Sequence, residues 1–318
     1  MSTPSRGART AFSARSGAGP RRTVGSLTVG VIGAGRVGAV LGAALARAGH
    51  RVVAASGVSA VARGRIGRLL PGVANLPADE VAGAADDLLI IAVPDDSLPG
   101  VVAGLAATGA LRPGQVVAHT SGAHGLDVLA AAAAAGCHPL ALHPAMTFTG
   151  TAADLANLPG ISYGVTAPAE LRAFAARLVT DLGGVPEWVA EPDRPLYHAA
   201  LAHGANHLVT LVNEAADRLR EAGVAEPEKV LGPLLQAALD NALRLGDAAL
   251  TGPVSRGDAG TVARHLDRLA ATAPQAVPAY RALARRTADR AIAAGRLRPV
   301  DAESLLGVLA DAHRETVG

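Results

Sequence analysis

Short apolar runs alternate with helical segments between residues 27 and 190. The runs are rich in Val, Ile and Leu, and the segments between them place apolar residues three and four positions apart. This alternation predicts a doubly wound α/β sheet whose mostly parallel strands are joined by crossover helices. The strand runs are LTVGVI, HRVVAAS, DLLIIAV, GQVVAHT, HPLALH, ISYGVT and PEWVA, and the helical stretches are 36–48, 97–107, 124–135 and 168–182.

The strand pattern stops near residue 191, and long amphipathic segments follow it. We therefore expect an α/β domain over residues 25–190 and an all-helical domain over 191–318. The predicted helices of the second domain are 194–222, 227–247, 258–271, 275–294 and 301–314.

The charge is distributed unevenly along the chain. Residues 1–24 hold five arginines and no acidic residue, whereas the whole chain has a net charge of only +2, so the remainder is acidic. The basic segment is rich in Ser, Gly and Thr and is predicted to be a disordered tail. The acidic body argues against nucleic-acid binding, and no uninterrupted apolar run approaches the ~20 residues of a membrane helix.

Two residue counts restrict the chemistry. The single cysteine, Cys137, excludes an internal disulfide, which agrees with a reducing cytoplasm. Lys229 is the sole lysine and lies in a solvent-type connection, which leaves no lysine for catalysis.

The apolar stretch after Arg21 and Arg22 is interrupted by Arg36, which favours a strand and turn over an export signal, so we expect a cytoplasmic protein.

A glycine-rich turn follows the first strand. Gly33, Gly35 and Gly38 have G-x-G-x-x-G spacing and stand between a strand and a helix. The first glycine permits the tight turn, the second lets a pyrophosphate approach the backbone, and the third lets the helix pack on the strand. The turn, with Arg36 and Val37 inside it, predicts dinucleotide binding, the alternative being a glycine turn without a ligand.

The second strand distinguishes between dinucleotides. An NAD site places an acidic residue about 20 residues after the turn, but no acid occurs from Ala39 to Ala78. The hydroxyls and guanidiniums that occur there instead suit a 2′-phosphate, which favours NADP(H). These groups are Ser56, Ser59, Arg63 and Arg36, whereas we expect Arg65 and Arg68 to be solvated on their helix.

Three loops follow the carboxyl ends of strands, where ligands of such sheets bind: 92–97, 118–125 and 142–150. Val93 and Pro94 are expected to turn the backbone along the cofactor. His119 and Ser121 offer polar atoms near the expected nicotinamide, and His143 follows the next strand, although each has a structural alternative.

The predicted helix over 194–215 carries an uncharged polar stripe. At 3.6 residues per turn, the stripe spans about 120° of arc, and Tyr197 and His198 lie off it as packing residues. A stripe without charge suits a cleft better than open water. Metal binding by the i, i+4 histidines is not expected, because that face has no acidic partner. The stripe consists of His203, Asn206, His207, Thr210 and Asn213.

Six segments in order carry a resemblance to a known family: GAGRVG, DDLLIIAVPDDSL, VVAHTSGAHGLDVL, LHPAMTFTG, YHAALAHGANHL and LTGPVSRGD. They resemble two-domain Rossmann-like proteins whose helical C-terminal domain is known only as a domain of unknown function. That family is similar to ketopantoate reductase, pyrroline-carboxylate reductase, and the 6-phosphogluconate and hydroxyisobutyrate dehydrogenases. The resemblance implies NADP(H) at the glycine turn, a substrate between the domains and a homodimer formed through the helical domain.

The chain departs from its dehydrogenase relatives at one position. There the first helix of the second domain carries a lysine and, four residues later, an asparagine. Asn206 matches the asparagine, but Ala202 stands in place of the lysine. His203 is next to it and either replaces the acid, because imidazole titrates near neutrality, or is structural.

The loop before residue 259 holds the last candidate. Arg256 is placed to pair with a substrate carboxylate or with a protein carboxylate at a dimer interface, and Asp258 to cap the next helix.

The candidate residues together suggest an NADPH-dependent reductase of a small 2-oxo acid or imino acid, with ketopantoate as first choice by resemblance. His203 or His119 would be the acid, Asn206 and Ser121 would orient the substrate, and Arg256 would hold its carboxylate. The alternative is a non-catalytic NADP(H) sensor or scaffold, which the missing lysine supports.

Overall fold

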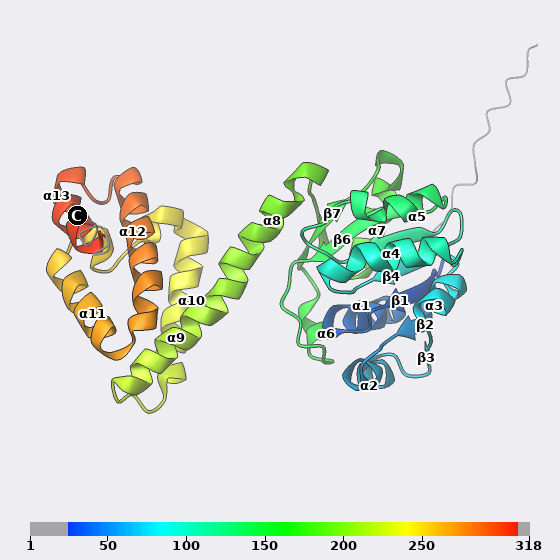
Figure 1. Ribbon diagram of the computed structural model, residues 1–318, viewed down its shortest axis with the longest axis horizontal. Helices are drawn as coiled ribbons and strands as arrows, with labels where there is room; N and C mark the ends of the chain where they lie inside the picture. Colours follow the sequence, from blue (N-terminus) through cyan, green and yellow to red (C-terminus); the bar gives the residue numbers. More distant parts are fainter. Residues whose placement is uncertain (1–24, 311–318) are drawn as a thin grey trace, which may run out of the picture. The chain divides into compact units, whose positions relative to one another are not determined.

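The apolar runs of the first part of the chain form one eight-stranded sheet (Figure 1). The strand order is β3-β2-β1-β4-β5-β6-β7-β8, and each pair is parallel except β6 and β7. The connection from β6 to β7 returns at the same edge of the sheet without crossing it, so β7 runs the other way. The strands are β1 (Thr28–Ile32), β2 (Arg51–Ser56), β3 (Ala74–Asn75), β4 (Leu88–Ile91), β5 (Val116–His119), β6 (His138–Pro144), β7 (Ser162–Thr166) and β8 (Val185–Trp188).

The computed structural model describes residues 25–310, which divide into two units, one ending at Ala202 and the next beginning at His203. The tail predicted over residues 1–24 and the end of the helix predicted over 301–314 lie outside the described residues. The sequence predicts a domain boundary at 190/191, and the first compact unit of the structure extends to Ala202, so it includes Arg194, which bonds to the carbonyl oxygen of Gly164.

Helices cover both faces of the sheet, as the alternation of side chains along each strand requires. In β4, Leu88 and Ile90 enter the apolar cluster on the face of α1 and α7, whereas Leu89 and Ile91 enter the cluster on the other face. The mostly parallel, doubly wound fold is thus confirmed. The first face carries α1 (Arg36–Arg47), α2 (Ala60–Leu69), α6 (Asp154–Asn157) and α7 (Arg172–Asp181), and the second carries α3 (Ala78–Ala84), α4 (Leu98–Ala107) and α5 (Ala130–Ala134).

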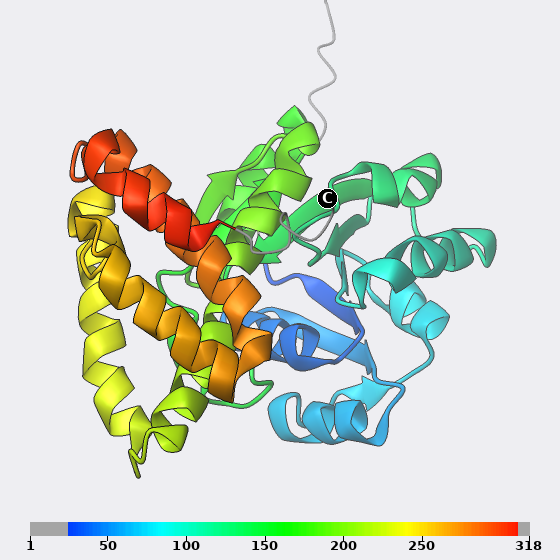
Figure 2. The same cartoon turned by 60° about the vertical axis from the view of Figure 1, so that its left-hand side comes forward.

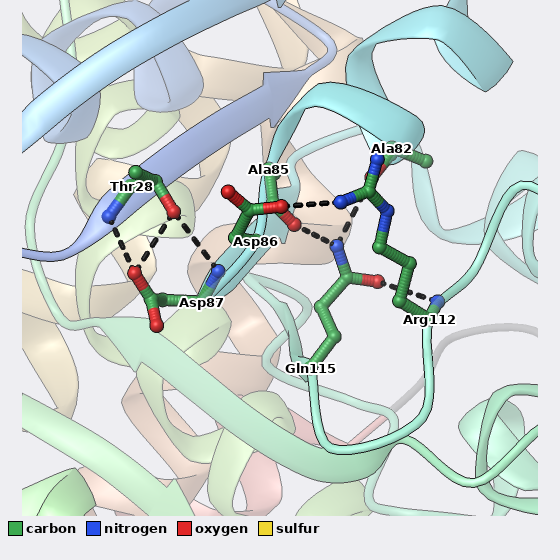
Figure 3. A network of polar contacts seen from close by, with 7 residues as sticks. All are labelled: Thr28, Ala82, Ala85, Asp86, Asp87, Arg112 and Gln115. Atoms are coloured by element: carbon green, nitrogen blue, oxygen red, sulfur yellow. Dashed lines mark hydrogen bonds and ion pairs between the residues drawn. The ribbon is translucent and has the colours of Figure 1, made fainter. Parts of the chain in front are cut away.

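The amino edge of the sheet is closed by structural hydrogen bonds (Figure 3). The Asp87 carboxylate accepts from the amide and the hydroxyl of Thr28 at 2.9 and 2.8 Å, which ties β4 to β1. Gln115 is fully buried, and its amide nitrogen donates to the carbonyl oxygens of Ala82, at 3.0 Å, and of Ala85. These side chains satisfy backbone atoms of the fold, whereas the loops predicted to bind ligands lie at the opposite, carboxyl edge.

The predicted helix over 194–222 is not α-helical throughout. It consists of α8 (Arg194–Leu201), a π-helical turn at Ala202–Asn206, and α9 (His207–Glu221). Because a π-helical turn holds more residues than an α-helical one, the 3.6-residue phase assumed for the polar stripe does not hold across it. Such turns are frequent at functional sites.

The second unit has its own apolar core. The helices α11 (Ala259–Thr272), α12 (Val277–Ala293) and α13 (Pro299–Leu309) pack against one another (Figure 2). Their contact includes Val262, Ala288 and Leu305, each fully buried. In α10 (Pro227–Leu245) only Pro227 and Leu231 are buried. No helix among residues 25–310 is long and apolar enough to cross a membrane.

Candidate functional site at the carboxyl edge of the sheet

The glycine turn after β1 is as tight as its spacing requires. Gly33 has a φ of 84°, and a Cβ atom there would lie 2.5 Å from the carbonyl oxygen of Ala92. A Cβ atom at Gly38 would lie 2.3 Å from the carbonyl oxygen of Gly33. The amides of Gly33 and Ala34 both donate to the carbonyl oxygen of Ser56, at 3.1 and 2.8 Å. Only glycine fits at Gly33 and Gly38, for reasons internal to the protein.

Gly35 differs from the other two glycines, because no contact within residues 25–310 requires a glycine there. It is the N-cap of α1, and a Cβ atom there would meet no atom closer than 3.9 Å. The open space lies in front of the helix N-terminus, where free amides and the helix dipole favour an anion. Val93 reaches the same turn, its Cγ1 atom 3.0 Å from the Cβ position of Gly33, while Pro94 after it is exposed.

The end of β2 presents hydroxyl and guanidinium groups beside this turn. Ser56 is buried at the end of the strand, and Ser59 caps α2 by accepting from the amide of Ala62 at 3.1 Å. The hydroxyl proton of Ser59 is then free to be donated. Arg63 donates to the carbonyl oxygen of Val58, and Arg36 is exposed at the start of α1.

The loop after β6 packs against the glycine turn, which the sequence did not indicate. A Cβ atom at Gly150 would lie 2.5 Å from Nε of Arg65 and 3.1 Å from Cα of Arg36. The expectation that Arg65 is solvated is therefore wrong: it is half-buried against this loop, whereas Arg68 is exposed as predicted.

Asp154 holds that loop in place. Its carboxylate is 2% exposed and accepts hydrogen bonds from the hydroxyl of Thr149 at 2.8 Å and the amide of Gly150 at 2.7 Å. Burial opposes ionisation, but these hydrogen bonds outweigh it and hold the pKa of Asp154 below its usual range. In the sequence, this role of Asp154 is indicated only by the position of an acidic residue four places after Gly150.

His119 organises the loop after β5. Its side chain is fully buried, its Nε2 donates to the carbonyl oxygen of Gly125 at 2.7 Å, and its Nδ1 accepts from the amide of Ser121 at 3.1 Å. Burial is the main reason that the pKa of His119 falls to about 4, so the ring is neutral near pH 7. Because both ring nitrogens are occupied by the backbone, this geometry favours a structural role over that of an acid.

Ser121 is held by the same loop but keeps a proton to donate. Its Oγ accepts from the amides of Ala123 and His124 at 3.2 and 3.1 Å, and the residue is 6% exposed. Glu191, just before α8, accepts from the amide of Leu126 at 2.7 Å and so clamps the far end of the loop. The loop is therefore a fixed element of the carboxyl edge.

An aromatic cluster lies next to this loop. Nδ1 of His143, near the end of β6, is 3.0 Å from the hydroxyl oxygen of Tyr197, and the ring of His143 meets that of His198 edge to face at 5.9 Å between centroids. Two glycines give the rings room: a Cβ atom at Gly122 would lie 2.6 Å from His198, and one at Gly164 would lie 2.5 Å from the Tyr197 hydroxyl. Tyr197 and His198, predicted to be packing residues, thus contact the candidate His143 directly.

Arg194 is a fully buried cation beside this cluster. Its Nη1 donates to the carbonyl oxygen of Gly164 at 3.3 Å, and its guanidinium carbon lies 5.9 Å from the ring centre of Tyr197. Its Nε and Nη2 atoms are buried and have no hydrogen-bond partner in the described part of the chain. Burial accordingly lowers the pKa of the Arg194 guanidinium.

The remaining predicted residues belong to the second unit. His203 and Asn206 lie in the π-helical turn and are exposed, and Nδ1 of His203 is 3.1 Å from Nδ1 of His207. Arg256 is exposed in the 3₁₀ turn Val254–Arg256. Asp258 caps α11 by accepting from the amide of Thr261 at 3.0 Å, which confirms the predicted cap.

The structure thus gathers the predicted cofactor residues and both loop candidates on one unit. Arg194, Gly122 and Gly164 were missed, because their importance comes from contacts between segments distant in sequence. The sequence indicated the role of Arg194 only weakly. It begins a helix that has no acidic residue one turn later to pair with it.

Two family models match consecutive parts of the chain. Residues 16–144 match the Rossmann-like domain, and residues 161–287 match the domain of unknown function DUF2520. No curated protein sequence matches the chain.

Solved structures resemble the chain over most of its length. A candidate NADP oxidoreductase from Bacteroides fragilis has a TM-score of 0.72 at 22% identity and covers 83% of this chain and 98% of its own. A pyrroline-5-carboxylate reductase from Streptococcus pyogenes has a TM-score of 0.56 at 19% identity, covering 84% and 99%. The Plasmodium falciparum pyrroline carboxylate reductase, solved with NADP bound, has a TM-score of 0.55 at 12% identity, covering 83% and 98%. At these identities the likeness shows a common fold.

Proposed function

The chain joins a Rossmann-like domain to a DUF2520 domain, and on this basis we propose that it is an NADPH-dependent reductase of a small oxo acid or imino acid. The open cradle at Gly35 is the observation that carries the proposal. The turn brings the backbone to the N-terminus of α1 and leaves space for a pyrophosphate there, although no contact in the described part of the chain requires a glycine at that position. A dinucleotide explains that glycine.

The cofactor we propose is NADP(H) rather than NAD(H). Ser59 has a free hydroxyl proton, Arg36 begins α1 and Arg63 lies in α2 just after β2, and no acidic residue occurs between Ala39 and Ala78. Such groups would bind a 2′-phosphate through charge-assisted hydrogen bonds. The Plasmodium relative, whose structure holds NADP, is consistent with this choice.

The substrate class follows from the groups around the predicted nicotinamide position. Ser121 has a hydroxyl proton to donate, and His143 lies three strands from the glycine turn, about 14 Å at the usual strand spacing. We propose that His203 and Asn206 contribute from the π-helical turn and that Arg256 binds a carboxylate. Ketopantoate and cyclic imines are the first substrates to test, the latter because two of the structural relatives are pyrroline-carboxylate reductases.

We further propose that the protein is a homodimer formed through its helical unit. Large apolar side chains are exposed on α10, where Val230 is 49%, Leu234 62% and Leu243 79% exposed. The core of the unit is made by α11, α12 and α13 and leaves α10 largely uncovered. Exposed apolar surface of this kind is typical of an interface.

The decisive experiment measures binding and turnover separately. Titration of purified protein with NADPH and NADH should give tighter binding of NADPH, and equal affinity would contradict the cofactor assignment. Oxidation of NADPH is then followed with a panel of 2-oxo acids and cyclic imines. An enzyme turns over at least one of them, whereas a non-catalytic sensor or scaffold binds NADPH and turns over none.

Variants of the helical unit complete the test. His203→Ala and Asn206→Ala should each lower turnover if the π-helical turn serves the substrate, with NADPH affinity unchanged. Unchanged turnover in both would remove this turn from the site. Arg256→Ala should raise KM for a carboxylate substrate more than it lowers kcat.

A further inference from the structure

We propose that Tyr197 and His143 form a proton relay that protonates the reduced substrate, with the buried Arg194 as the counter-charge of the tyrosinate. The inference rests on the proposed reductase function, because hydride delivery to a carbonyl or imine carbon leaves an oxygen or nitrogen that needs a proton. His119 is fully occupied by the backbone, and the lysine of the dehydrogenase relatives has no equivalent here. The relay therefore assigns proton donation to His143, and His203 would then bind the substrate rather than protonate it.

The relay uses the contact between the two side chains in one direction. The phenol oxygen of Tyr197 lies 3.0 Å from Nδ1 of His143, and in the proposed relay the phenol donates its proton to that nitrogen. A neutral imidazole that accepts at Nδ1 carries its proton on Nε2. Burial is the main reason that the pKa of His143 falls to about 4, which keeps the ring neutral near pH 7.

The donor end of the relay is open to a ligand. Nε2 of His143 makes no hydrogen bond in the described part of the chain. It is not a buried atom, so a ligand can reach it. It faces Gly122, where a Cβ atom would lie 3.1 Å from it. Gly122 belongs to the loop after β5 that carries Ser121, so both groups serve the same edge of the sheet.

Arg194 supplies the charge that the relay needs. A buried guanidinium with two unpartnered donor atoms is costly, and it gains a counter-ion when the neighbouring phenol loses its proton. Burial raises the pKa of Tyr197 above its usual value, and the charge of Arg194 offsets part of that rise. The charged and titratable groups around His143 are Tyr197, His198 and Arg194 on α8, His119 on β5 and Asp95 after β4.

The proton transfers balance as follows. Bound NADPH would supply a hydride to the substrate carbon, which would leave the electron pair of the C=O or C=N bond on the oxygen or nitrogen. That atom takes the proton from Nε2 of His143 while Nδ1 takes the phenol proton of Tyr197, so the imidazole ends neutral. The tyrosinate beside Arg194 regains its proton from water after the product leaves.

The kinetic test uses conservative variants and a matched control. Tyr197→Phe and His143→Gln should each lower turnover about 100-fold or more, with NADPH affinity within about twofold of the wild type. Because the two residues act in series, the double variant should lose no more turnover than the more damaging of the two single variants. The control is Tyr280→Phe, since Tyr280 forms a second tyrosine–histidine pair with His265 at 2.8 Å in the other unit and should leave turnover unchanged.

A spectroscopic test needs neither cofactor nor substrate. The chain has three tyrosines, so the difference in tyrosinate absorbance between wild type and Tyr197→Phe isolates the titration of Tyr197. Its pKa should rise by about one unit or more in Arg194→Gln and change less in Arg194→Lys, which keeps the charge. A pKa that is the same in Arg194→Gln as in the wild type would overturn the role of Arg194.

The outcomes separate the relay from the proposed function. A wild type that binds NADPH and reduces none of the panel overturns the reductase proposal, and the relay with it. A wild type that reduces a substrate while Tyr197→Phe keeps its turnover, or while the single losses add in the double variant, overturns the relay alone.

Discussion

A Cβ atom at Gly38 would lie 2.3 Å from the carbonyl oxygen of Gly33, whereas one at Gly35 would meet nothing closer than 3.9 Å. The two glycines of one motif therefore serve different purposes. Gly38 allows α1 to pack on the turn, and Gly35 leaves room for a ligand.

This difference predicts opposite behaviour for two alanine variants. Gly38→Ala should destabilise the protein by about 1–3 kcal/mol, because the helix must move away from the turn. Gly35→Ala should leave the thermal unfolding midpoint within about a degree and weaken NADPH binding at least tenfold. Differential scanning calorimetry and fluorescence titration measure the two effects. Equal NADPH affinity in Gly35→Ala and wild type would mean that the turn does not bind the pyrophosphate.

The arginines around β2 predict a change in cofactor preference. Arg63→Ala and Arg36→Ala should each weaken NADPH binding by about 1.5–3 kcal/mol, or tenfold and more, and should barely affect NADH. Arg68→Ala, on the exposed side of α2, is the matched control. If all three variants weaken NADPH binding equally, the change in affinity comes from net charge, and no specific 2′-phosphate site exists.

The buried imidazole of His119 predicts how stability depends on pH. Its pKa falls from 6.5 in the unfolded chain to about 4 in the fold, so between these values the unfolded chain binds the extra proton. Stability is therefore complete above pH 6.5 and decreases as the pH falls, by about 2 kcal/mol for this group between pH 7 and pH 5.

Urea unfolding at both pH values checks this dependence. In His119→Gln, which cannot titrate, the loss of stability between pH 7 and pH 5 should be smaller by about that amount. His143, whose pKa is also about 4, should retain part of the dependence in the variant. An unchanged difference between the two pH values would show that His119 is not buried as a neutral ring.

The amino edge predicts a residue that matters for stability alone. Gln115→Leu removes the donor to two buried carbonyl oxygens, those of Ala82 and Ala85, and should cost about 2–4 kcal/mol of unfolding free energy. Arg112→Ala, which breaks an exposed ion pair with Asp86, should cost less than about 1 kcal/mol. Neither change should alter NADPH affinity, and a lowered affinity would mean that the two edges of the sheet are coupled.

The exposed face of α10 predicts the site of self-association. If the proposed homodimer forms through α10, Leu234→Glu combined with Leu243→Glu should shift sedimentation from dimer to monomer, because charges would be buried in an apolar interface. Val58→Glu, at a residue 91% exposed in the other unit, is the control and should leave the dimer intact. A double variant that remains dimeric would place the interface elsewhere.

The periodicity of the sequence predicted each of the seven longer strands and the five helical segments after residue 191. These predictions succeeded because the spacing of apolar residues follows the period of a helix or a strand, and over a long segment that period is unambiguous. The glycine turn was equally readable, since its spacing reflects backbone geometry within one strand–turn–helix unit. Short elements such as α3 and α6 were missed, because seven and four residues carry too little periodicity.

The sequence by itself thus determined the order of the elements, the dinucleotide turn and the absence of an acidic residue after β2. Only the tertiary structure decided that His119 is held by the backbone, that Arg65 packs on the loop at Gly150, and that Tyr197 meets His143 with Arg194 behind it. The π-helical turn also appeared only there, since it shifts the phase of a helix whose sequence reads as regular. The reason is physical: contacts within one element follow from chain geometry, whereas contacts between β5, β6, β7 and α8 arise only when the sheet brings their ends together.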